Sequence, residues 1–266
     1  MFKKVSGILM VMLVLLAVVV SGCSSKEKAA TSEKITATSQ LNGKTFAVPT
    51  GTAADKLVLS KFPNAQFQYY NTVLDCCMAV KAGKADAAAY DEPILKNIAA
   101  KNAGLAVLPD MITVDNYGFA VNLSNKELKT AIDDTLKELK ANGTYDQMMT
   151  RWFPKTGSPA PMPEIKLDGT KGTLKFGTAA VTEPFSFMDG SQKVVGFDIE
   201  LASYVAQKMG MKLEVVNMDF GAMIPALTAG KVDMIGACIT ITDERAKSVL
   251  FSDSYYKGGI AALVKE

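Results

Sequence analysis

Short apolar runs alternate with amphipathic stretches between residues 41 and 122. Apolar runs bounded by turn residues indicate buried strands, whereas apolar residues that recur at helical spacing indicate helices. Strands that alternate with helices are typical of an α/β fold with parallel strands. The predicted strands are residues 44–49, 66–70, 85–90, 105–108 and 117–122, and the predicted helices are residues 53–62, 72–81 and 94–102.

The second half of the chain repeats this alternation. Residues 125–153 carry the pattern of long amphipathic helices, and the Pro- and Gly-rich residues 154–172 are predicted to form a linker. The sequence therefore predicts two α/β regions, separated by helices and a linker. In the second region the predicted strands are residues 173–178, 212–216 and 232–238, and the predicted helices are residues 196–208, 224–229 and 242–248.

Two short segments, residues 82–86 (AGKAD) and 229–233 (AGKVD), resemble each other. Each follows a predicted helix and leads into a predicted strand, and its glycine can take the left-handed conformation that ends helices. One of the two strands ends at Asp91, and the other runs through Cys238 toward Arg245. Since ligands of open parallel sheets gather outside the carboxyl ends of the strands, these side chains are candidates for a binding site.

Residues 1–22 have the pattern of a bacterial secretory signal. Two lysines precede an uninterrupted apolar run, residues 7–20, which is shorter than the roughly 20 residues of a membrane-spanning helix. The run ends in Val-Ser-Gly-Cys, which resembles the lipobox of bacterial lipoproteins, where the cysteine (here Cys23) carries the lipid. Residues 23–40 are then a lipidated cysteine and a polar tether. A plain signal peptide or membrane anchor with an incidental cysteine is the alternative.

Composition excludes several classes of function. The chain has no histidine, which removes His-based nucleophile activation and His-ligated metal sites. Its 29 Lys and Arg residues against 27 Asp and Glu residues give a net charge of +2, too balanced for a nucleic-acid-binding protein. Loss of Lys3 and Lys4 with the signal lowers this charge to 0, so membrane attachment would depend on the lipid. The sequence predicts no cofactor and no metal site.

The cysteines do not suggest a disulfide framework. With Cys23 assigned to the lipid, Cys76, Cys77 and Cys238 remain, which is an odd number. Adjacent cysteines rarely bridge each other without strain, and the spacing matches no zinc site. We expect Cys76 and Cys77 to serve in packing.

Several motifs are spread over most of residues 41–153 and 173–266. They are LNGK (41–44), GT (51–52), AGKAD (82–86), YD (90–91), NGTY (142–145), RWF (151–153), GFDIELA (196–202), MDF (218–220), IPAL (224–227), TITDER (240–245) and FSDSYY (251–256). Together these motifs resemble the polar amino-acid-binding proteins of ABC importers (solute-binding protein family 3), and the glutamine-binding branch most closely around residues 218–256. The resemblance implies a two-lobed α/β fold of the type II periplasmic-binding-protein kind.

The order of the two halves differs from that family, whose members begin with the part that here comes last. The chain therefore looks circularly permuted, or like a displaced fusion of adjacent genes. The resemblance implies a smaller lobe at residues 41–120, C-terminal-type helices of the larger lobe at 121–153, a linker at 154–172 and the larger lobe at 173–266. One of the two strands that usually join the lobes would then be opened, leaving a single crossing near residues 116–122. We hypothesise a looser hinge, or a homodimer that exchanges lobes.

The same resemblance assigns roles to polar residues. Arg245 would bind the ligand's α-carboxylate, because a planar guanidinium can hold a carboxylate through two parallel hydrogen bonds. Thr240 would add a hydroxyl, and a helix that begins near Thr242 would aim free N–H groups at the anion. Asp91, from the other lobe, would bind the α-ammonium, and Thr52 would contact the carboxylate. Taken alone, Arg245 could be a solvated helix residue and Asp91 a cap of the next turn.

The remaining site residues concern the ligand's side chain and the ammonium group. Phe220 and Tyr90 would flank the side chain, although aromatic residues at such positions are more often part of a core. The carbonyl of Cys238, where relatives often have Gly or Ser, would face the ammonium, with the thiol incidental.

The pocket departs from the family where relatives grip a distal amide or cation. Ala179 and Thr182 stand where the glutamine and basic-residue binders carry an Asp and an aromatic residue, and Pro49 stands where a lysine is expected. Glu183 is the nearby charged residue. We therefore expect a ligand with a small or neutral polar side chain.

The resemblance implies a lipid-anchored receptor on the extracytoplasmic face of the cell membrane. It would close two lobes over a free amino acid and present it to the membrane subunits of an ABC permease. One alternative is an enzyme on the same scaffold, similar to cyclohexadienyl dehydratases, for which Glu92 or Glu183 would have to serve as the acid. The other is a ligand sensor for a membrane partner.

Overall fold

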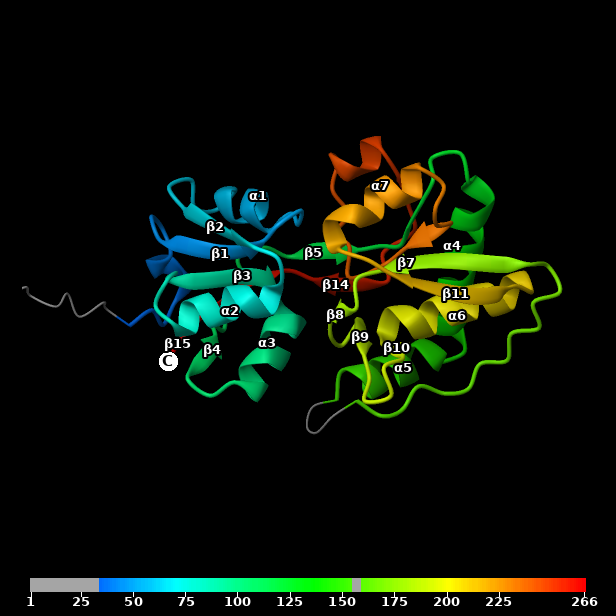
Figure 1. The fold of residues 1–266 in the computed structure, drawn as a ribbon, viewed down its shortest axis with the longest axis horizontal. Coiled ribbons are helices and arrows are strands. Elements are labelled where there is room, and N and C mark those ends of the chain that lie inside the picture. Colours follow the sequence, from blue (N-terminus) through cyan, green and yellow to red (C-terminus); the bar gives the residue numbers. More distant parts are fainter. Residues whose placement is uncertain (1–33, 155–158) are drawn as a thin grey trace, which may run out of the picture. The chain divides into compact units, whose positions relative to one another are not determined.

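The structure is a computed structural model that describes residues 34–154 and 159–266. The predicted signal, Cys23 and most of the predicted tether lie outside these residues. No helix within the two described ranges is both long and apolar enough to cross a membrane. Residues Lys34–Glu266 contain two five-stranded sheets with their helices (Figure 1), which we call the first and second lobes. The mixed α/β architecture expected from the sequence is confirmed.

The first lobe is built around the sheet β2-β1-β3-β15-β4. Strands β1, β2 and β3 run parallel, as predicted, but β15 is antiparallel to β3 and β4 because it enters the lobe from the opposite direction. The strands are β1 (Thr45–Pro49), β2 (Gln66–Tyr70), β3 (Ala87–Asp91), β4 (Leu105–Val107) and β15 (Ile260–Lys265), and the helices are α1 (Ala54–Leu59), α2 (Val73–Lys81), α3 (Glu92–Lys101) and the 3-10 turn Thr38–Gln40.

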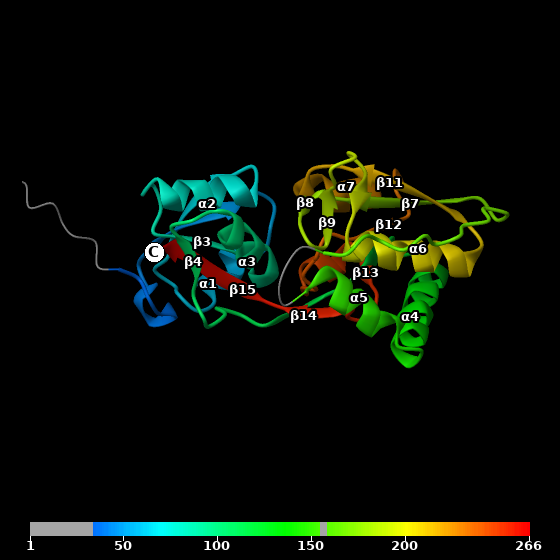
Figure 2. The ribbon, with the colours of Figure 1, turned by 90° about the horizontal axis from the view of Figure 1, so that it is seen from below.

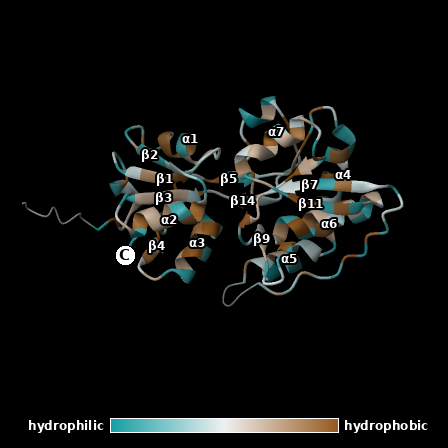
Figure 3. Cartoon of the chain, viewed as in Figure 1, coloured by the Kyte–Doolittle hydropathy of each residue, from teal (hydrophilic) through white to brown (hydrophobic). Residues whose placement is uncertain are grey.

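Both faces of this sheet are covered, which explains why its central strands are apolar except at their ends, where Thr45, Asp91 and Lys265 stand. Successive residues of a strand point to opposite faces, so Ala47 and Ala88 pack on the side of α2 and α3. Phe46 and Val48 pack on the other side, with α1. Figure 3 shows how hydrophobic and hydrophilic residues alternate along the covering helices.

The second lobe is built around the sheet β11-β7-β12-β6-β13, in which β6 is antiparallel to β12 and β13. Phe176 and Met234 face α4, α5 and α6, while Ala120 and Ile235 face α7. The elements are β6 (Ala120–Val121), α4 (Lys126–Ala141), α5 (Thr144–Trp152), β7 (Thr173–Thr178), β8 (Val181–Thr182), β9 (Ser186–Met188), β10 (Val194–Val195), α6 (Phe197–Met209), β11 (Lys212–Asn217), the 3-10 turn Phe220–Ala222, α7 (Met223–Thr228), β12 (Met234–Ile235), the 3-10 turn Arg245–Lys247 and β13 (Leu250–Phe251).

Two strands cross between the lobes, which corrects the prediction of a single crossing. Strands β5 (Asp115–Tyr117) and β14 (Tyr256–Gly258) pair antiparallel, and both lie between the sheets in Figures 1 and 2. The second crossing passes close to the first: a Cβ on Gly259 would lie 1.9 Å from the carbonyl oxygen of Thr113. A loose hinge and exchanged lobes were expected from a single crossing, so the paired strands remove the reason for both.

The crossing also corrects one domain boundary. Residues 173–266 were assigned to the larger lobe, but β15 pairs with β3 and β4 of the first lobe. The pairing joins positions far apart in the sequence, such as Val264 and Ala87, and no local pattern records it. The described part of the predicted linker has no helix or strand before β7.

Candidate functional site

The carboxyl end of β3 and the segment that follows β12 meet in one small cavity. All seven residues predicted to bind ligand line it, together with Ala53, Ala54 and Ile260. Its volume is about 10 Å³, room for about one water molecule. The structure thus brings the predicted residues together, while their roles toward a ligand stay predictions. The seven are Thr52, Tyr90, Asp91, Phe220, Cys238, Thr240 and Arg245.

Asp91 ends strand β3 and supplies the cavity's negative charge. Its side chain is buried, one carboxylate oxygen accepts from the Tyr117 hydroxyl, and the other lies 3.8 Å from the Cys238 sulfur as acceptor of the thiol. Burial raises the pKa of Asp91 to about 7, against the lowering effects of the Tyr117 hydrogen bond and the Arg245 charge. A cationic group that reached Asp91 would favour its ionised form.

Arg245 supplies the positive charge on the opposite lobe. Its Nη1 donates to the carbonyl of Thr240 at 3.0 Å, and its guanidinium carbon lies 5.5 Å from the centre of the Phe220 ring. Burial lowers the pKa of Arg245, and the neighbouring Tyr90 and Asp91 oppose that shift. Asp91 and Arg245 are the two charged residues of this cavity lining, and neither is in a salt bridge within residues 34–154 and 159–266.

The helix predicted at residues 242–248 is not formed. The segment holds a single 3-10 turn, Arg245–Lys247, and the backbone N–H of Arg245 already donates to the Thr242 hydroxyl at 3.2 Å. The predicted helix at these residues is therefore wrong, and the Arg245 N–H is not free. Asp243 and Glu244 before Arg245, and Lys247 after it, are the residue types that favour the start and the end of a helix. The segment between them is nevertheless too short to form a second turn.

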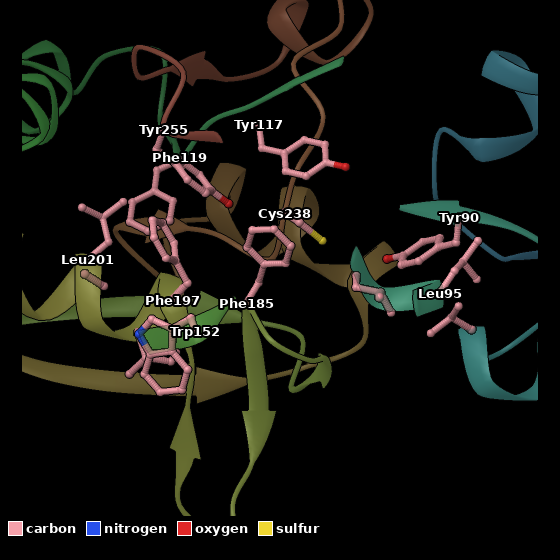
Figure 4. Packing of buried hydrophobic residues seen from close by; sticks show 14 of the residues in the cluster. Tyr90, Leu95, Tyr117, Phe119, Trp152, Phe185, Phe197, Leu201, Cys238 and Tyr255 are labelled. Carbon is pink, nitrogen blue, oxygen red and sulfur yellow. The ribbon is translucent and has the colours of Figure 1, made fainter. Parts of the chain in front are cut away.

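Thr52 and Tyr90 reach the cavity from the first lobe. The Thr52 hydroxyl donates to the carbonyl of Pro49 at 2.9 Å and accepts from the N–H of Ala54 at 3.3 Å, which holds the loop before α1. Tyr90 is buried at the end of β3, and burial raises the pKa of its hydroxyl. In Figure 4 its side chain extends toward Cys238.

Cys238 follows β12 in a left-handed backbone conformation, with φ of 47°, which is uncommon for any residue but glycine. Its side chain is 2% exposed. Its backbone N–H donates to Asp198 Oδ2 at 3.0 Å, and the Tyr255 hydroxyl donates to the same oxygen at 3.0 Å. Burial raises the pKa of the Cys238 thiol far above its ordinary value, so the sulfur is protonated.

Two residues of this network were not predicted from the sequence. Asp198 lies on α6, behind the cavity, and burial raises its pKa to about 7. Tyr117, on the crossing strand β5, donates to Asp91 and accepts from the N–H of Gly259 at 3.2 Å. The GFDIELA motif contains Asp198, but the sequence does not tell that this carboxylate turns inward.

A larger cleft of about 1000 Å³ adjoins the cavity and shares Thr52, Tyr90 and Phe220 with it. Its volume is at the upper end of the range of small-molecule sites. Among the described residues that line it, the charged one is Asp219, which is exposed. The other polar side chains are hydroxyls and amides, of Thr50, Thr52, Asn71, Thr72, Tyr90, Thr182 and Asn217.

The positions at which the sequence departs from the family lie around this cleft. Pro49 and Thr182 line it, and Ala179 is buried beside them, with its carbonyl accepting from the Thr182 hydroxyl at 3.1 Å. Glu183 does not line the cleft; it pairs with Lys101 at 2.7 Å.

The two acids proposed for an enzymatic alternative are also away from the cavity. Glu92 forms a salt bridge with Lys96, and Glu183 with Lys101. Both glutamates line a separate cavity of about 600 Å³ with Trp152. Neither glutamate lines the cavity that holds Asp91. No cluster of three or more potential metal ligands occurs in the part of the chain that the structure describes.

Comparison with known proteins links this geometry to one family. The family model described as "Bacterial extracellular solute-binding proteins, family 3" matches residues 18–155 and 174–266. These two segments make up most of the chain.

Individual relatives match shorter segments. The chain is 45% identical over 84 residues to a "Probable histidine-binding protein" of Campylobacter jejuni, covering 32% of each chain. It is 45% identical over 86 residues to the "Arginine-binding extracellular protein ArtP" of Bacillus subtilis, covering 32% of this chain and 33% of that one. The chain thus spans about a third of the length of these curated relatives. A solved structure, "An ancestral arginine-binding protein bound to arginine", is 53% identical, covers 32% of this chain and 38% of that chain, and has a TM-score of 0.32.

Proposed function

The chain belongs to the bacterial extracellular solute-binding proteins, family 3, and on that premise we propose that it captures a free α-amino acid between its two lobes. The observation that carries the proposal is the pair of opposite charges in one cavity. Asp91 comes from the first lobe and Arg245 from the second. A zwitterionic amino acid has both complementary charges on one carbon, so it can engage both lobes at once.

Each end of the ligand has its own group of partners. Arg245 binds the carboxylate through its guanidinium, with hydroxyls of Thr240 and Thr52 beside it. Asp91 binds the ammonium, with the carbonyl of Cys238 as a second acceptor. Because these groups are held at the ends of strands of two different sheets, binding of one amino acid links the lobes.

The larger cleft is proposed to hold the ligand's side chain between Tyr90 and Phe220. The names of the relatives refer to histidine and arginine, which have basic side chains. Here the cleft is lined by amides and hydroxyls, and its carboxylate, Asp219, is exposed to solvent. We therefore favour a neutral polar side chain, and L-glutamine is the first ligand to test.

The test is thermal unfolding of the purified protein with each of the twenty amino acids. An amino acid at about a hundred times its dissociation constant adds about 2.7 kcal/mol to the free energy of unfolding and raises the midpoint visibly. We expect the largest shift with L-glutamine or another neutral polar amino acid. L-Glutaminamide lacks the α-carboxylate and N-acetyl-L-glutamine lacks the α-ammonium, so neither compound should raise the unfolding midpoint. A cooperative transition that none of the twenty moves would contradict the proposal.

We also propose that the protein works at the cell surface, held by a lipid on Cys23, and delivers its ligand to an ABC permease. The Val-Ser-Gly-Cys sequence and the family support this. Cells fed a labelled fatty acid should transfer the label to the protein, and a Cys23→Ser variant should remain unlabelled. Label on that variant would contradict the assignment. Delivery to the permease is tested by measuring amino-acid uptake in cells that lack the protein, and we expect that uptake to be lost.

The permuted order of the halves remains a proposal. The start and the end of the described chain pack in the same cluster of the first lobe, where Leu41 lies with Ile260 and Val264. Chain ends that lie together can be joined, and a new opening made elsewhere. A chain rearranged to begin at residue 173, with residue 266 joined to residue 41, should give the same shifts with amino acids.

A further inference from the structure

Cys238 holds a conformation that its own backbone disfavours. Its φ of 47° lies in the left-handed region, where a side chain crowds the backbone, and it is buried at the cavity. Within the described chain one other non-glycine residue, Gln192, has a positive φ, and that residue is exposed in a turn. Strained residues at binding sites persist when their surroundings hold them.

Asp198 is hydrogen-bonded to the backbone of Cys238. One oxygen of its carboxylate accepts both the backbone N–H of Cys238 and the hydroxyl of Tyr255, each at 3.0 Å. The second oxygen has no hydrogen-bond partner among the described residues, and the side chain is completely buried. Burial of a carboxyl group without a cation is costly, so stability alone gives no reason for an acid at this position.

A second buried acid on the same helix shows the usual solution. Glu200 lies two residues further along α6 and is also completely buried. Its carboxylate accepts from Arg151 at 2.7 and 3.0 Å and from the Trp152 indole N–H at 2.6 Å. Glu200 therefore joins α5 to α6 through a charge pair. Asp198 has no such cation; it contacts the strained backbone of Cys238, which in turn lines the proposed ligand cavity.

We propose that Asp198 is a positioning residue for ligand binding. It does not line the cavity; through its hydrogen bond it keeps the Cys238 backbone left-handed, which sets the thiol against Asp91 and fixes the start of the segment that leads to Thr240. The effect of Asp198 on ligand affinity rests on the proposed function. Its effect on the backbone conformation of Cys238 does not depend on any ligand.

The test is a double-mutant cycle between positions 198 and 238. Glycine adopts a positive φ without strain, so Cys238→Gly removes the need for a holding group. We expect Asp198→Ala to lower L-glutamine affinity by about tenfold in the native chain and by less than about threefold in the Cys238→Gly chain. The unfolding midpoint without ligand should show the same non-additivity. Equal losses in both chains would overturn the proposal.

Two further variants separate positioning from general support. Glu200→Gln lies on the same helix and should lower stability, but its effect should add to that of Cys238→Gly without coupling. Asp198→Asn keeps an oxygen that accepts both hydrogen bonds and should retain L-glutamine affinity within about threefold. A loss of L-glutamine affinity of about tenfold or more in Asp198→Asn would overturn the proposal, and this criterion still applies if Asp198→Ala fails to fold.

The ligand-free measurement keeps the two proposals apart. If the native chain binds none of the twenty amino acids, the proposed function fails, but the unfolding cycle still decides whether Asp198 holds Cys238. Additive unfolding losses together with normal L-glutamine binding would overturn the inference and leave the proposed function intact.

Discussion

The two lobes have the same sheet plan up to the corner before the third strand, and they differ where that strand ends. Asp86 in the first lobe exchanges hydrogen bonds with the backbone of Thr45, at 2.8 and 2.9 Å. Asp233 in the second lobe does the same with Lys175, at 2.7 and 2.9 Å. The AGKAD and AGKVD segments thus have the same structural role, because each fixes the register of its strand through the hydrogen bonds of its aspartate. The proposed ligand-binding residues lie at the opposite end of each strand.

Those far ends differ in both charge and backbone. In the first lobe, β3 ends at Asp91 and continues directly into the ten-residue helix α3. In the second lobe, Cys238 turns the chain into an irregular segment that carries Thr240 and Arg245. The end of β3 thus places the short side chain of Asp91 at the cavity, and the irregular segment after β12 places the long side chain of Arg245 there. The comparison predicts that substitutions at these two positions weaken ligand binding in different ways.

The largest effect is expected from Arg245→Lys. A lysine keeps the charge but cannot make the two parallel bonds of a guanidinium, and loss of those bonds should weaken L-glutamine binding about 100-fold. Isothermal titration measures the change. Arg151→Lys is the matched control: it disturbs the pair with Glu200 and should lower stability while affinity stays unchanged. A similar loss of affinity in both variants would contradict the assignment of Arg245.

The next effect concerns pH and the Asp91 end. The pKa of Asp91 is raised to about 7, because burial outweighs the Tyr117 hydrogen bond and the Arg245 charge, and Asp115 raises it further. An ammonium ligand needs the ionised carboxylate, so affinity for L-glutamine should fall up to about tenfold per pH unit below 7 and level off above it. Asp91→Asn should bind weakly with a flat profile. A native profile that stays flat between pH 5 and 8 would contradict this role.

The same shift has a consequence for the protein without ligand. A folded-state pKa above the ordinary value of 3.8 means that the native state binds more protons than the unfolded state between about pH 4 and 7. Asp91 and Asp198 therefore support the native fold most at low pH, and this support is lost as pH rises through 7. Denaturant unfolding of Asp91→Asn at pH 5 and pH 8 should show a smaller fall in stability than the native chain.

The sequence predicted which candidate residues lie close together better than it predicted the connections between the lobes. Seven residues from both halves were expected at the ligand, and the structure brings all seven to one cavity, because the family motifs record their positions. The regular pattern located strands such as 66–70 and 173–178 at their observed bounds. Hydrophobic patterning detects elements whose two faces differ, and it carries no record of which distant strand an element joins.

The misses stem from that limit. Strand β15 was placed in the wrong lobe because its partners lie far away in the sequence, as with Val264 and Ala87, which are 177 residues apart. Asp198 was missed because residues 197–203 of α6 are buried on every side, so no polar face singled it out. The helix expected at residues 242–248 was wrong because its apparent caps flank a single turn. The first two errors concern long-range contacts that a local pattern cannot contain, whereas the third is a misinterpreted local pattern.

The smallest effect tests the part of the comparison in which the lobes are alike. Gly83 and Gly230 have φ of 72° and 69°, and a Cβ at either position would meet no atom within 4 Å. Alanine should therefore cost the same backbone strain at both, about 1 kcal/mol each and additive in the double variant. Gly236→Ala is the contrast, since its Cβ would lie 2.4 Å from the Phe119 ring and should cost more. Denaturant unfolding measures all four variants, and a clear inequality between Gly83→Ala and Gly230→Ala would mean that the two corners, alike in sequence and hydrogen bonds, support their lobes to different extents.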